Sequence, residues 1–539
     1  MNGEILELSL RGMAHSAKWL ASLGCALDNQ QQQQPMPSLS CTFLLAKSMF
    51  DCKEFARAVH FLNKQQCSSM DKRSLFLMFY CKYLDYSKQE ALSTCNSFAQ
   101  QEQTTTTAPN DSAQKHKITQ KFTLLLQELC TLPEKDSFLH YLEACIRFRL
   151  LDRKGALTAC IASLNSNAAN WDCWCLLTKL VPSQQSLSQL ICNQLHIPSQ
   201  WSFMLLFFEA KTLLSLQIAP QHTAALLQTL QTQFPHFAFI SFCKGLLQYQ
   251  ERAFSEAIQT LSTLTEVQND PFMLEASELL SNIHYLSDHK EALAALAQQA
   301  CEIDALRPES CVIAGNFYSL RQEPTLAIVQ FQRALKLDAQ HLGAWVLMGH
   351  EYLEMRATSP AIQCYRKALQ GDPHDHRAWY ALGQCYELLK MPSYALFYYK
   401  KAVQFKGLDS RMWSALSTIY QQLGNLPKAI STLKQAISLQ STEDDCGYVQ
   451  LQRLATLHLK AFDSEAAMRV YEEVVQLPSF WAQPSTQEIC AVLWKLALHC
   501  YQRERWQEAK KYCMKIYELN GMEREGAQEL LSLLEARDS

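Results

Sequence analysis

Hydrophobic and small residues in the middle of the chain follow a helical spacing. In two consecutive segments they stand three, four and seven residues apart, which places them on one face of an α-helix. The members of this pattern are Trp345, Met348, Gly349 and Tyr352 in the first segment, and Ala361, Tyr365 and Ala368 in the second. Ser359 followed by Pro360 is typical of a helix start, so we expect the second helix to begin there. The pattern predicts a hairpin of two amphipathic helices.

The same hairpin pattern returns every 34 residues between Cys311 and Ser441. Equivalent positions hold Cys311, Trp345, Trp379 and Trp413 at the start of each copy, then Gly315, Gly349, Gly383 and Ser417, and in the second helix Phe331, Tyr365, Tyr399 and Leu433. This period and order are typical of the tetratricopeptide repeat, whose hairpins stack because one hairpin cannot bury its apolar face alone. We predict an all-α, tetratricopeptide-repeat superhelical solenoid in which Trp345 and Trp379 occupy equivalent buried positions.

Small residues inside the pattern indicate where two helices come close together. We expect Gly349 and Ala361 to let the backbones of one hairpin approach, and Tyr365 to fill the space that they leave. The functional residues must then lie at positions between those of the packed face.

The regularity of the repeats changes along the chain and divides it into five segments. They are an N-terminal helix with a glutamine-rich flexible part (1–35), degenerate repeats (36–165), less regular helical repeats (166–300), four regular repeats (301–441), and degenerate repeats with a capping helix (442–539). Residues near 100–117 are threonine-rich and lack periodicity, so we predict a disordered insertion there.

Composition narrows the range of functions. A net charge of −3 gives no basic field that would attract nucleic acid or anionic lipid. No apolar run is long enough for a membrane span, and no secretory signal is visible. The 21 cysteines are scattered without a C-x-x-C pair, which favours free thiols in a reducing intracellular compartment. Motifs typical of nucleotide binding, zinc proteases and serine hydrolases are absent, so we predict no catalytic, cofactor or metal site.

Two blocks resemble one family in particular. The segments CEIDALRPESCVIAGNFYSLR and DHRAWYALGQCYELLKMP, together with AKSMFDCKEFARAVHFL near the N-terminus, closely resemble subunit eight of the anaphase-promoting complex (cyclosome), the Cdc23 type. The resemblance covers most of the chain and is poorest at 180–235. It implies a non-catalytic scaffold of a ubiquitin ligase that controls mitosis, located in the nucleus and cytoplasm.

The same resemblance implies particular partners. They are a second copy of the chain through 36–165, other cyclosome subunits, and activators of the Cdc20/Cdh1 type whose C-box enters a groove of the regular repeats. From the helical spacing we expect seven first-helix residues to point away from the packed face and bind an arginine-bearing peptide. These are Asn316, Ser319, His350, Glu354, Tyr380, Gln384 and Glu387. Carboxylates pair with guanidinium in a forked geometry, and aromatic rings stack on it.

Two alternatives belong to other classes. Co-chaperone adaptors with these repeats hold a chaperone's C-terminal carboxylate in a clamp of Lys, Asn, Asn, Lys and Arg. The corresponding positions here are Val312, Asn316, Leu347, Arg377 and Ala381, so only two match and the leading cation is missing. An enzyme fused to repeats, such as a glycosyltransferase, needs a non-repeat catalytic domain, and no stretch is long or strand-rich enough.

Overall fold

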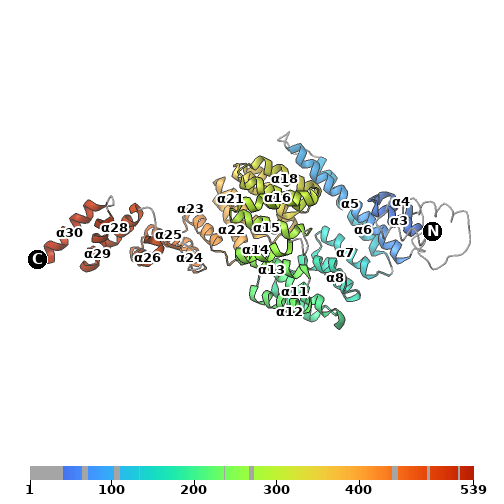
Figure 1. The fold of residues 1–539 in the computed structure, drawn as a ribbon, viewed down its shortest axis with the longest axis horizontal. Helices are drawn as coiled ribbons and strands as arrows, with labels where there is room; N and C mark the ends of the chain where they lie inside the picture. Colours follow the sequence, from blue (N-terminus) through green and yellow to red (C-terminus); the bar gives the residue numbers. More distant parts are fainter. Residues whose placement is uncertain are drawn as a thin grey trace, which may run out of the picture. The chain divides into compact units, whose positions relative to one another are not determined.

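The computed structural model describes residues 41–63, 71–101, 110–132, 134–235, 237–265, 272–439, 447–481, 486–519 and 523–538. In these residues every regular element is a helix, as Figure 1 shows, so the all-α prediction is confirmed. The chain divides into two compact units, residues 1–341 and 342–539, and each is described by itself. Within the described ranges no helix is both long and apolar enough to cross a lipid bilayer.

The first unit is built from helix α3 to helix α18. The bounds are α3 (Cys41–Asp51), α4 (Phe55–Asn63), α5 (Lys72–Gln101), α6 (Asn110–Cys130), α7 (Ser137–Arg149), α8 (Arg153–Ser166), α9 (Trp171–Leu180), α10 (Gln184–Asn193), the 3-10 helix η2 (Ser199–Trp201), α11 (Ser202–Leu216), α12 (Pro220–Gln233), α13 (Ala238–Gln250), α14 (Phe254–Thr265), α15 (Leu274–Leu286), α16 (Lys290–Asp304), α17 (Pro308–Leu320) and α18 (Pro324–Leu337). Helices pair in sequence, α7 with α8, α13 with α14 and α17 with α18, while α15 also packs against α17.

The second unit continues the same pairing. The bounds are α19 (Leu342–Glu354), α20 (Thr358–Gly371), α21 (His376–Leu388), α22 (Pro392–Phe405), α23 (Ser410–Gln422), α24 (Leu426–Ser438), α25 (Gly447–Lys460), α26 (Ser464–Gln476), α27 (Pro478–Trp481), α28 (Thr486–Gln502), α29 (Trp506–Leu519) and α30 (Arg524–Asp538). Odd-numbered helices from α19 to α25 are the first helices of successive hairpins, and each packs on the even-numbered helix that follows it. The predicted domain limits within the repeats stay predictions.

Five successive hairpins, from α15–α16 to α23–α24, each turn through one left-handed residue at the same place. Positive φ angles occur at intervals of 34 residues, at Asp288, Gln322, Arg356, Lys390 and Gly424. The next backbone N–H then bonds back to the carbonyl oxygen five residues before it, as from Ala357 to Tyr352 at 2.8 Å. This is the Schellman end of a helix, which satisfies carbonyl groups that the helix itself leaves unpaired. The period read from the side chains is therefore also a period of the backbone.

Close approach of paired helices explains the glycines of the repeat. A Cβ atom added at Gly349 would lie 2.6 Å from Cε1 of Tyr365, and one added at Gly383 would lie 2.5 Å from Cδ1 of Tyr399. The fourth regular copy has other residues in place of the glycine and the tyrosine. Ser417 replaces the glycine, its Oγ donates to the carbonyl oxygen of Ala429 at 2.8 Å, and the smaller Leu433 replaces the ring. The predicted roles of Gly349 and Tyr365 are confirmed.

Tryptophans at the repeat start fasten the loop before them. Trp379 Nε1 donates to the carbonyl oxygen of Pro373 at 2.8 Å, and Trp413 Nε1 donates to that of Gly407 at 2.8 Å. Trp345, Trp379 and Trp413 are each the fourth residue of their helix, so their positions are equivalent. Trp345 is buried as predicted, whereas Trp379 is only half-buried because it lies at the end of the hairpin beside the loop that it holds.

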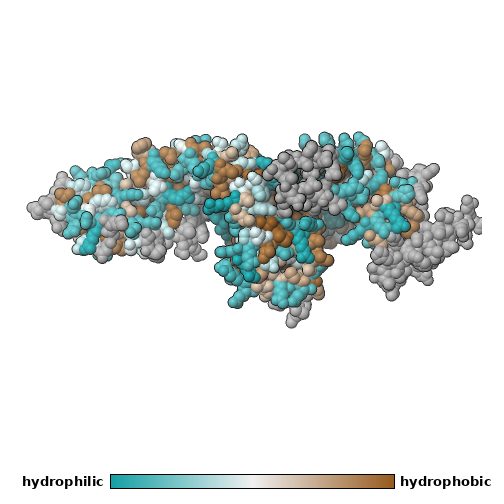
Figure 2. Space-filling view, turned by 90° about the horizontal axis from the view of Figure 1, so that it is seen from above, coloured by the Kyte–Doolittle hydropathy of each residue, from teal (hydrophilic) through white to brown (hydrophobic). Residues whose placement is uncertain are grey.

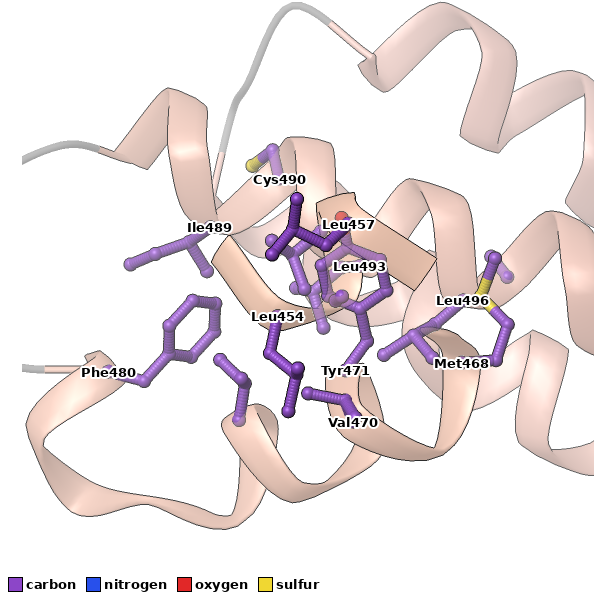
Figure 3. Packing of buried hydrophobic residues seen from close by; sticks show 14 of the residues in the cluster. Leu454, Leu457, Met468, Val470, Tyr471, Phe480, Ile489, Cys490, Leu493 and Leu496 are labelled. Atoms are coloured by element: carbon purple, nitrogen blue, oxygen red, sulfur yellow. The ribbon is translucent and has the colours of Figure 1, made fainter. Parts of the chain in front are cut away.

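The core of each unit is a succession of local clusters rather than one centre. In the C-terminal cluster shown in Figure 3, Leu454 of α25, Tyr471 of α26, Phe480 of α27 and Leu493 of α28 converge. Helix α30 closes this cluster by burying three apolar residues, Ala527, Leu530 and Leu534. On the face drawn in Figure 2, hydrophilic and hydrophobic residues are intermixed. Such local cores are expected of stacked repeats.

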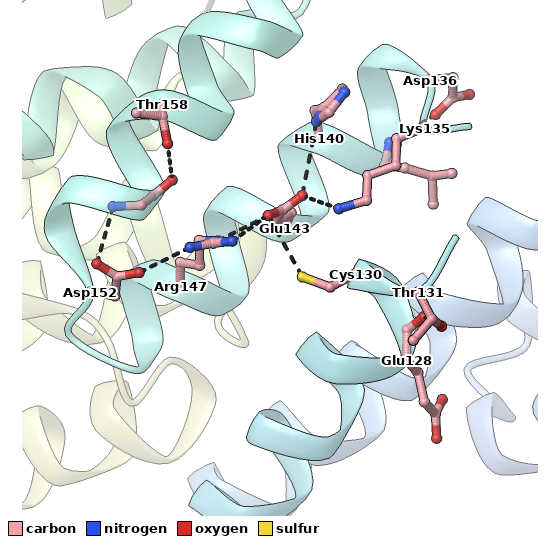
Figure 4. A network of polar contacts seen from close by, with 12 residues as sticks. Glu128, Cys130, Thr131, Lys135, Asp136, His140, Glu143, Arg147, Asp152 and Thr158 are labelled. Carbon is pink, nitrogen blue, oxygen red and sulfur yellow. Dashed lines mark hydrogen bonds and ion pairs between the residues drawn. The ribbon is translucent and has the colours of Figure 1, made fainter. Parts of the chain in front are cut away.

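A buried carboxylate joins the N-terminal hairpins of the first unit. Glu143 of α7 accepts from Lys135 Nζ at 2.7 Å and from Arg147 Nη2 at 2.7 Å, and Arg147 Nη1 also donates to Asp152 at 3.1 Å (Figure 4). Burial by itself would raise the pKa of Glu143, but the hydrogen bonds and charges of Lys135 and Arg147 outweigh it and lower that pKa. The network fixes the loop before α7 and the turn after it.

Two expectations about local structure need correction. Residues 110–117, predicted to be disordered, begin α6, because Ile118, Phe122 and Leu125 follow at helical spacing and are buried. Helix α20 begins at Thr358, two residues before Pro360, which was expected to be its first residue and is its third. The predictions for the N-terminal segment 1–35 and for residues 102–109 lie outside the described residues.

Candidate peptide-binding face

Polar groups of the second unit lie on its first helices, beginning with a histidine on α19. His350 Nδ1 is 2.9 Å from the hydroxyl of Tyr365, which reaches across the hairpin from α20. Burial lowers the pKa of His350 to about 4, and the positive charge of Arg377 acts in the same direction. His350 is therefore neutral at pH 7, and its Nδ1 is hydrogen-bonded to the tyrosine hydroxyl.

The next hairpin places a carboxylate where the previous one places an imidazole. The hydroxyl of Tyr399 donates to Glu387 Oε2 of α21 at 2.8 Å. The ring of Tyr380 lies 5.3 Å from the ring of Tyr399, and Gln384 is hydrogen-bonded to Tyr380. Burial and the nearby Glu387 raise the pKa of Tyr399, so its hydroxyl stays protonated as a donor. The structure thus brings Tyr380, Gln384 and Glu387 together on one face of α21, where Tyr380 also packs against the apolar core, and their contact with a partner stays a prediction.

Glu354 ends α19 and is exposed. Its negative charge acts on the hydroxyl of Tyr365, which places it near His350. Its side chain is exposed, and its contact with a partner stays a prediction.

Asn316 and Ser319, in the first unit, are buried, contrary to the expectation that they point away from the packed face. Asn316 Nδ2 donates to Ser281 Oγ at 3.0 Å and to Asn282 Oδ1 at 2.8 Å, and Ser319 Oγ lies 3.2 Å from the hydroxyl of Tyr285. The reason is that α15 packs directly against α17, so these polar groups bond to the neighbouring first helix. Their contact with a partner stays a prediction.

Further polar contacts connect three first helices of this unit, α21, α23 and α25. Gln422 Nε2 donates to Glu387 Oε1 at 3.5 Å. On α25, Arg453 donates from Nη1 to Ser414 Oγ at 2.9 Å and from Nη2 to Thr418 Oγ1 at 2.7 Å. We call the set Tyr380, Gln384, Glu387, Ser414, Thr418, Gln422 and Arg453 the first-helix face.

Sequence reasoning missed Tyr365, Tyr399 and Arg453. A signal was present for the two tyrosines, because the same position holds Phe331 and Leu433 in the flanking copies, and a buried tyrosine hydroxyl needs a partner. No comparable signal marks Arg453, since it lies in a copy whose register is shifted.

The arrangement also bears on the alternatives. Of the carboxylate-clamp positions, Val312, Asn316 and Ala381 are buried, and Arg377 is paired with Asp375 at 3.1 Å. Among the described residues no group of three or more His, Cys, Asp or Glu side chains is placed to hold a metal ion. The polar groups of the first-helix face are hydrogen-bond donors, acceptors and opposite charges, which suits the binding of a peptide.

Comparison with known proteins shows what the chain is similar to. Residues 40–245 match the model for Anaphase promoting complex subunit 8 / Cdc23, and residues 346–410 and 410–443 match tetratricopeptide repeats. The resemblance to Cdc23-type subunits is confirmed. The Cdc23-type match includes 180–235, the part that resembled the family least by eye.

Relatives of the Cdc23 type align with a little over half of the chain. Anaphase-promoting complex subunit 8 of Arabidopsis thaliana is 34% identical over 294 residues, 54% of this chain and 46% of the relative. The cell division cycle protein 23 homolog of Homo sapiens is 32% identical over 303 residues, 54% of this chain and 47% of the relative. The chain spans about half the length of the curated relatives it matches.

One solved structure shares the fold over almost the whole chain. It is the crystal structure of the APC/C hetero-tetramer Cut9-Hcn1, with a TM-score of 0.61 and 16% identity, covering 98% of this chain and 95% of that one. At this identity the likeness shows the fold, and the tetratricopeptide-repeat prediction is confirmed.

Proposed function

We propose that the chain is a non-catalytic scaffold subunit of the anaphase-promoting complex/cyclosome, a ubiquitin ligase of mitosis, acting in the nucleus and cytoplasm. The match of residues 40–245 to the subunit 8 / Cdc23 family carries this proposal. Stacked helix hairpins offer long surfaces for other subunits, and the described residues hold no metal cluster for catalysis.

The test is replacement in dividing cells. A tagged copy of the full chain should co-purify with the other cyclosome subunits and restore anaphase entry when the resident subunit is depleted. Co-purification with chaperones in place of cyclosome subunits would favour the adaptor alternative and refute the scaffold. Imaging of the same copy checks the proposed location.

We further propose that the chain forms a homodimer through residues 36–165. The resemblance to the family supports this, and exposed apolar side chains in the segment, such as Leu124 (59% exposed) and Phe138 (45%), are suitable contacts. Phe79 in the same segment is buried within the chain and does not contribute to that surface.

Light scattering on the full chain tests the dimer. Leu124→Asp combined with Phe138→Asp should shift the mass from dimer to monomer, because each change places a charge in an apolar contact. Leu326→Asp, at a leucine of α18 that is 46% exposed, is the matched control and should stay dimeric. A monomeric wild-type chain at micromolar concentration would refute the proposal.

We propose also that the first helices of the second unit bind the C-box of Cdc20/Cdh1-type activators through an arginine. Glu387 supports this proposal, because among the described residues its carboxylate accepts from Tyr399 and Gln422 and so retains acceptor positions for a guanidinium. Tyr380 beside it can stack on the same group.

Charge reversal tests the activator site. The double variant Glu354→Lys/Glu387→Lys should weaken activator binding by about 2 kcal/mol or more, as for central interface residues. Glu518→Lys, at an exposed carboxylate of α29, is the control and should bind normally. Unchanged binding in the double variant, with the complex assembled, would place the activator elsewhere.

A further inference from the structure

Arg453 on α25 is a half-buried cation without a carboxylate partner among the described residues. Two other arginines of the second unit, Arg377 and Arg411, are paired with Asp375 and Asp409 at the starts of their own helices. The hydrogen bonds of Arg453 go instead to the neutral hydroxyls of Ser414 and Thr418.

Two hydroxyls hold the guanidinium of Arg453, but no carboxylate in the described part of the chain neutralises its charge. It has five N–H donors, of which the hydroxyls take two, so three donors have no acceptor among the described residues. Burial lowers the pKa of Arg453, which means that the surroundings disfavour its charge. A charge kept in such a place is stabilised when an anion supplies charge-assisted hydrogen bonds.

We propose that Arg453 binds a carboxylate of the peptide that occupies the first-helix face. This inference rests on the proposed peptide binding, since Glu387 would take the arginine of the same peptide. The face then carries one acidic and one basic site, and it recognises a peptide that presents both charges in a fixed order.

The spacing of the two sites follows from the contacts between them. Glu387 bonds to Gln422, Gln422 is one turn of α23 from Thr418, and Thr418 bonds to Arg453. One turn rises about 5.4 Å, and the two side-chain contacts and the lengths of the Gln422 and Thr418 side chains add to it, so the two charges lie roughly 10–20 Å apart. An extended chain advances about 3.3 Å per residue, so the carboxylate and the arginine of the peptide should stand about three to six positions apart.

The experiment is a selection of peptides on the full-length protein. The probe is a displayed library of random decapeptides with one fixed arginine, selected on the wild type, Arg453→Gln, Arg453→Lys and Glu387→Gln. The wild type should enrich Asp or Glu about three to six positions from the arginine. Arg453→Gln should lose that enrichment and keep the arginine preference, and Arg453→Lys should retain part of it because the charge remains without the fork.

Affinities of one selected peptide complete the test. Its binding should weaken about tenfold in Arg453→Gln, and replacing its acidic residue by the amide should then make little further difference. Arg469→Gln, at an exposed arginine of α26, is the matched control and should bind as the wild type does. Circular dichroism of each variant separates a lost contact from a lost fold.

Distinct outcomes would overturn the two proposals. Selected peptides that need Glu387 but show no acidic preference would refute the role of Arg453 and leave the arginine site intact. Selection of no arginine-dependent peptide would refute both. The chain itself carries Glu443, Asp444 and Asp445 shortly before α25. If acidic peptides were enriched only in the variant E443Q/D444N/D445N, the chain's own carboxylates would serve Arg453, and the proposal would be wrong.

Discussion

Exchanging one glycine–tyrosine pair for the serine–leucine pair of a neighbouring repeat tests how the hairpins pack. Gly349→Ser places a Cβ atom 2.6 Å from Cε1 of Tyr365, whereas carbon atoms settle at about 3.5–4.0 Å. The ring or the helix must then move by about 1 Å, and such overpacking typically costs about 1–3 kcal/mol. Serine has a better helix propensity than glycine by about 0.5 kcal/mol, which leaves a net loss of about 1–2 kcal/mol.

The second change alone should also destabilise the hairpin. Tyr365→Leu removes a buried ring and the hydroxyl that contacts His350, with an expected loss of about 1–3 kcal/mol. The double variant reproduces the observed Ser417 and Leu433 pair, in which the serine finds a backbone carbonyl and the leucine leaves room for it. We therefore expect its loss to be smaller than the sum of the single losses by at least about 1 kcal/mol.

The assay is hydrogen exchange of the amides in α19 and α20 of the full chain, which reports the free energy of local opening in one hairpin. Gly407→Ser is the control, because a Cβ there meets nothing closer than 3.4 Å, and its effect should stay within about 0.5 kcal/mol. If the two single losses simply add in the double variant, close contact between the glycine and the ring does not determine the packing, and the reasoning fails.

Three further predictions follow from single groups. The pKa of His350 is lowered from its ordinary value of 6.5 to about 4 in the folded chain, so the folded state binds fewer protons than the unfolded state between these two values. The melting temperature should therefore fall as the pH drops from 7 to 4. It should fall less in the variant His350→Gln, which has no group to titrate there. Burial raises the pKa of the Cys364 thiol to about 12 and that of Cys385 to about 11. Iodoacetamide at pH 7.5 should therefore label the exposed Cys192 and Cys301 first, which peptide mass spectrometry would show. Early labelling of Cys364 would contradict its burial. Arg356 has a φ of 59°, so Arg356→Gly should stabilise the hairpin by about 0.5–1 kcal/mol in denaturant unfolding, whereas Arg469→Gly inside α26 should destabilise it by about 1 kcal/mol.

Side-chain periodicity predicted the fold because its physical causes are local. Gly349 lies on the first helix of a hairpin, and Tyr365 lies at the facing position of the second. Their places in the repeat predicted a contact between the two helices, and the structure shows that contact. Residues 110–117 were misjudged because their polar composition outweighed the apolar spacing that begins at Ile118. A short polar start to a long helix has the composition of a loop.

Candidate binding residues were harder to predict, because exposure depends on neighbouring repeats. Glu387 and Tyr380 share a face of one helix, and helical spacing alone was enough to find them. Asn316 has an equally polar side chain, yet its burial is decided by α15, which lies 34 residues earlier in the sequence. The role of Arg453 depends on its contact with Ser414 and Thr418 of α23, a neighbouring helix. The spacing of residues within α25 alone does not predict that contact.

The tyrosines that cross each hairpin have a consequence for how such a face can evolve. Tyr399 fills the interior with its ring, while its hydroxyl ends at Glu387 on the outer side. A change of this one residue to phenylalanine would keep the shape of the hairpin and release a lone pair of Glu387 to a partner. Affinity for a cationic ligand could thus drift through substitutions that no partner ever touches, and a survey of surface positions would overlook the residues that control it.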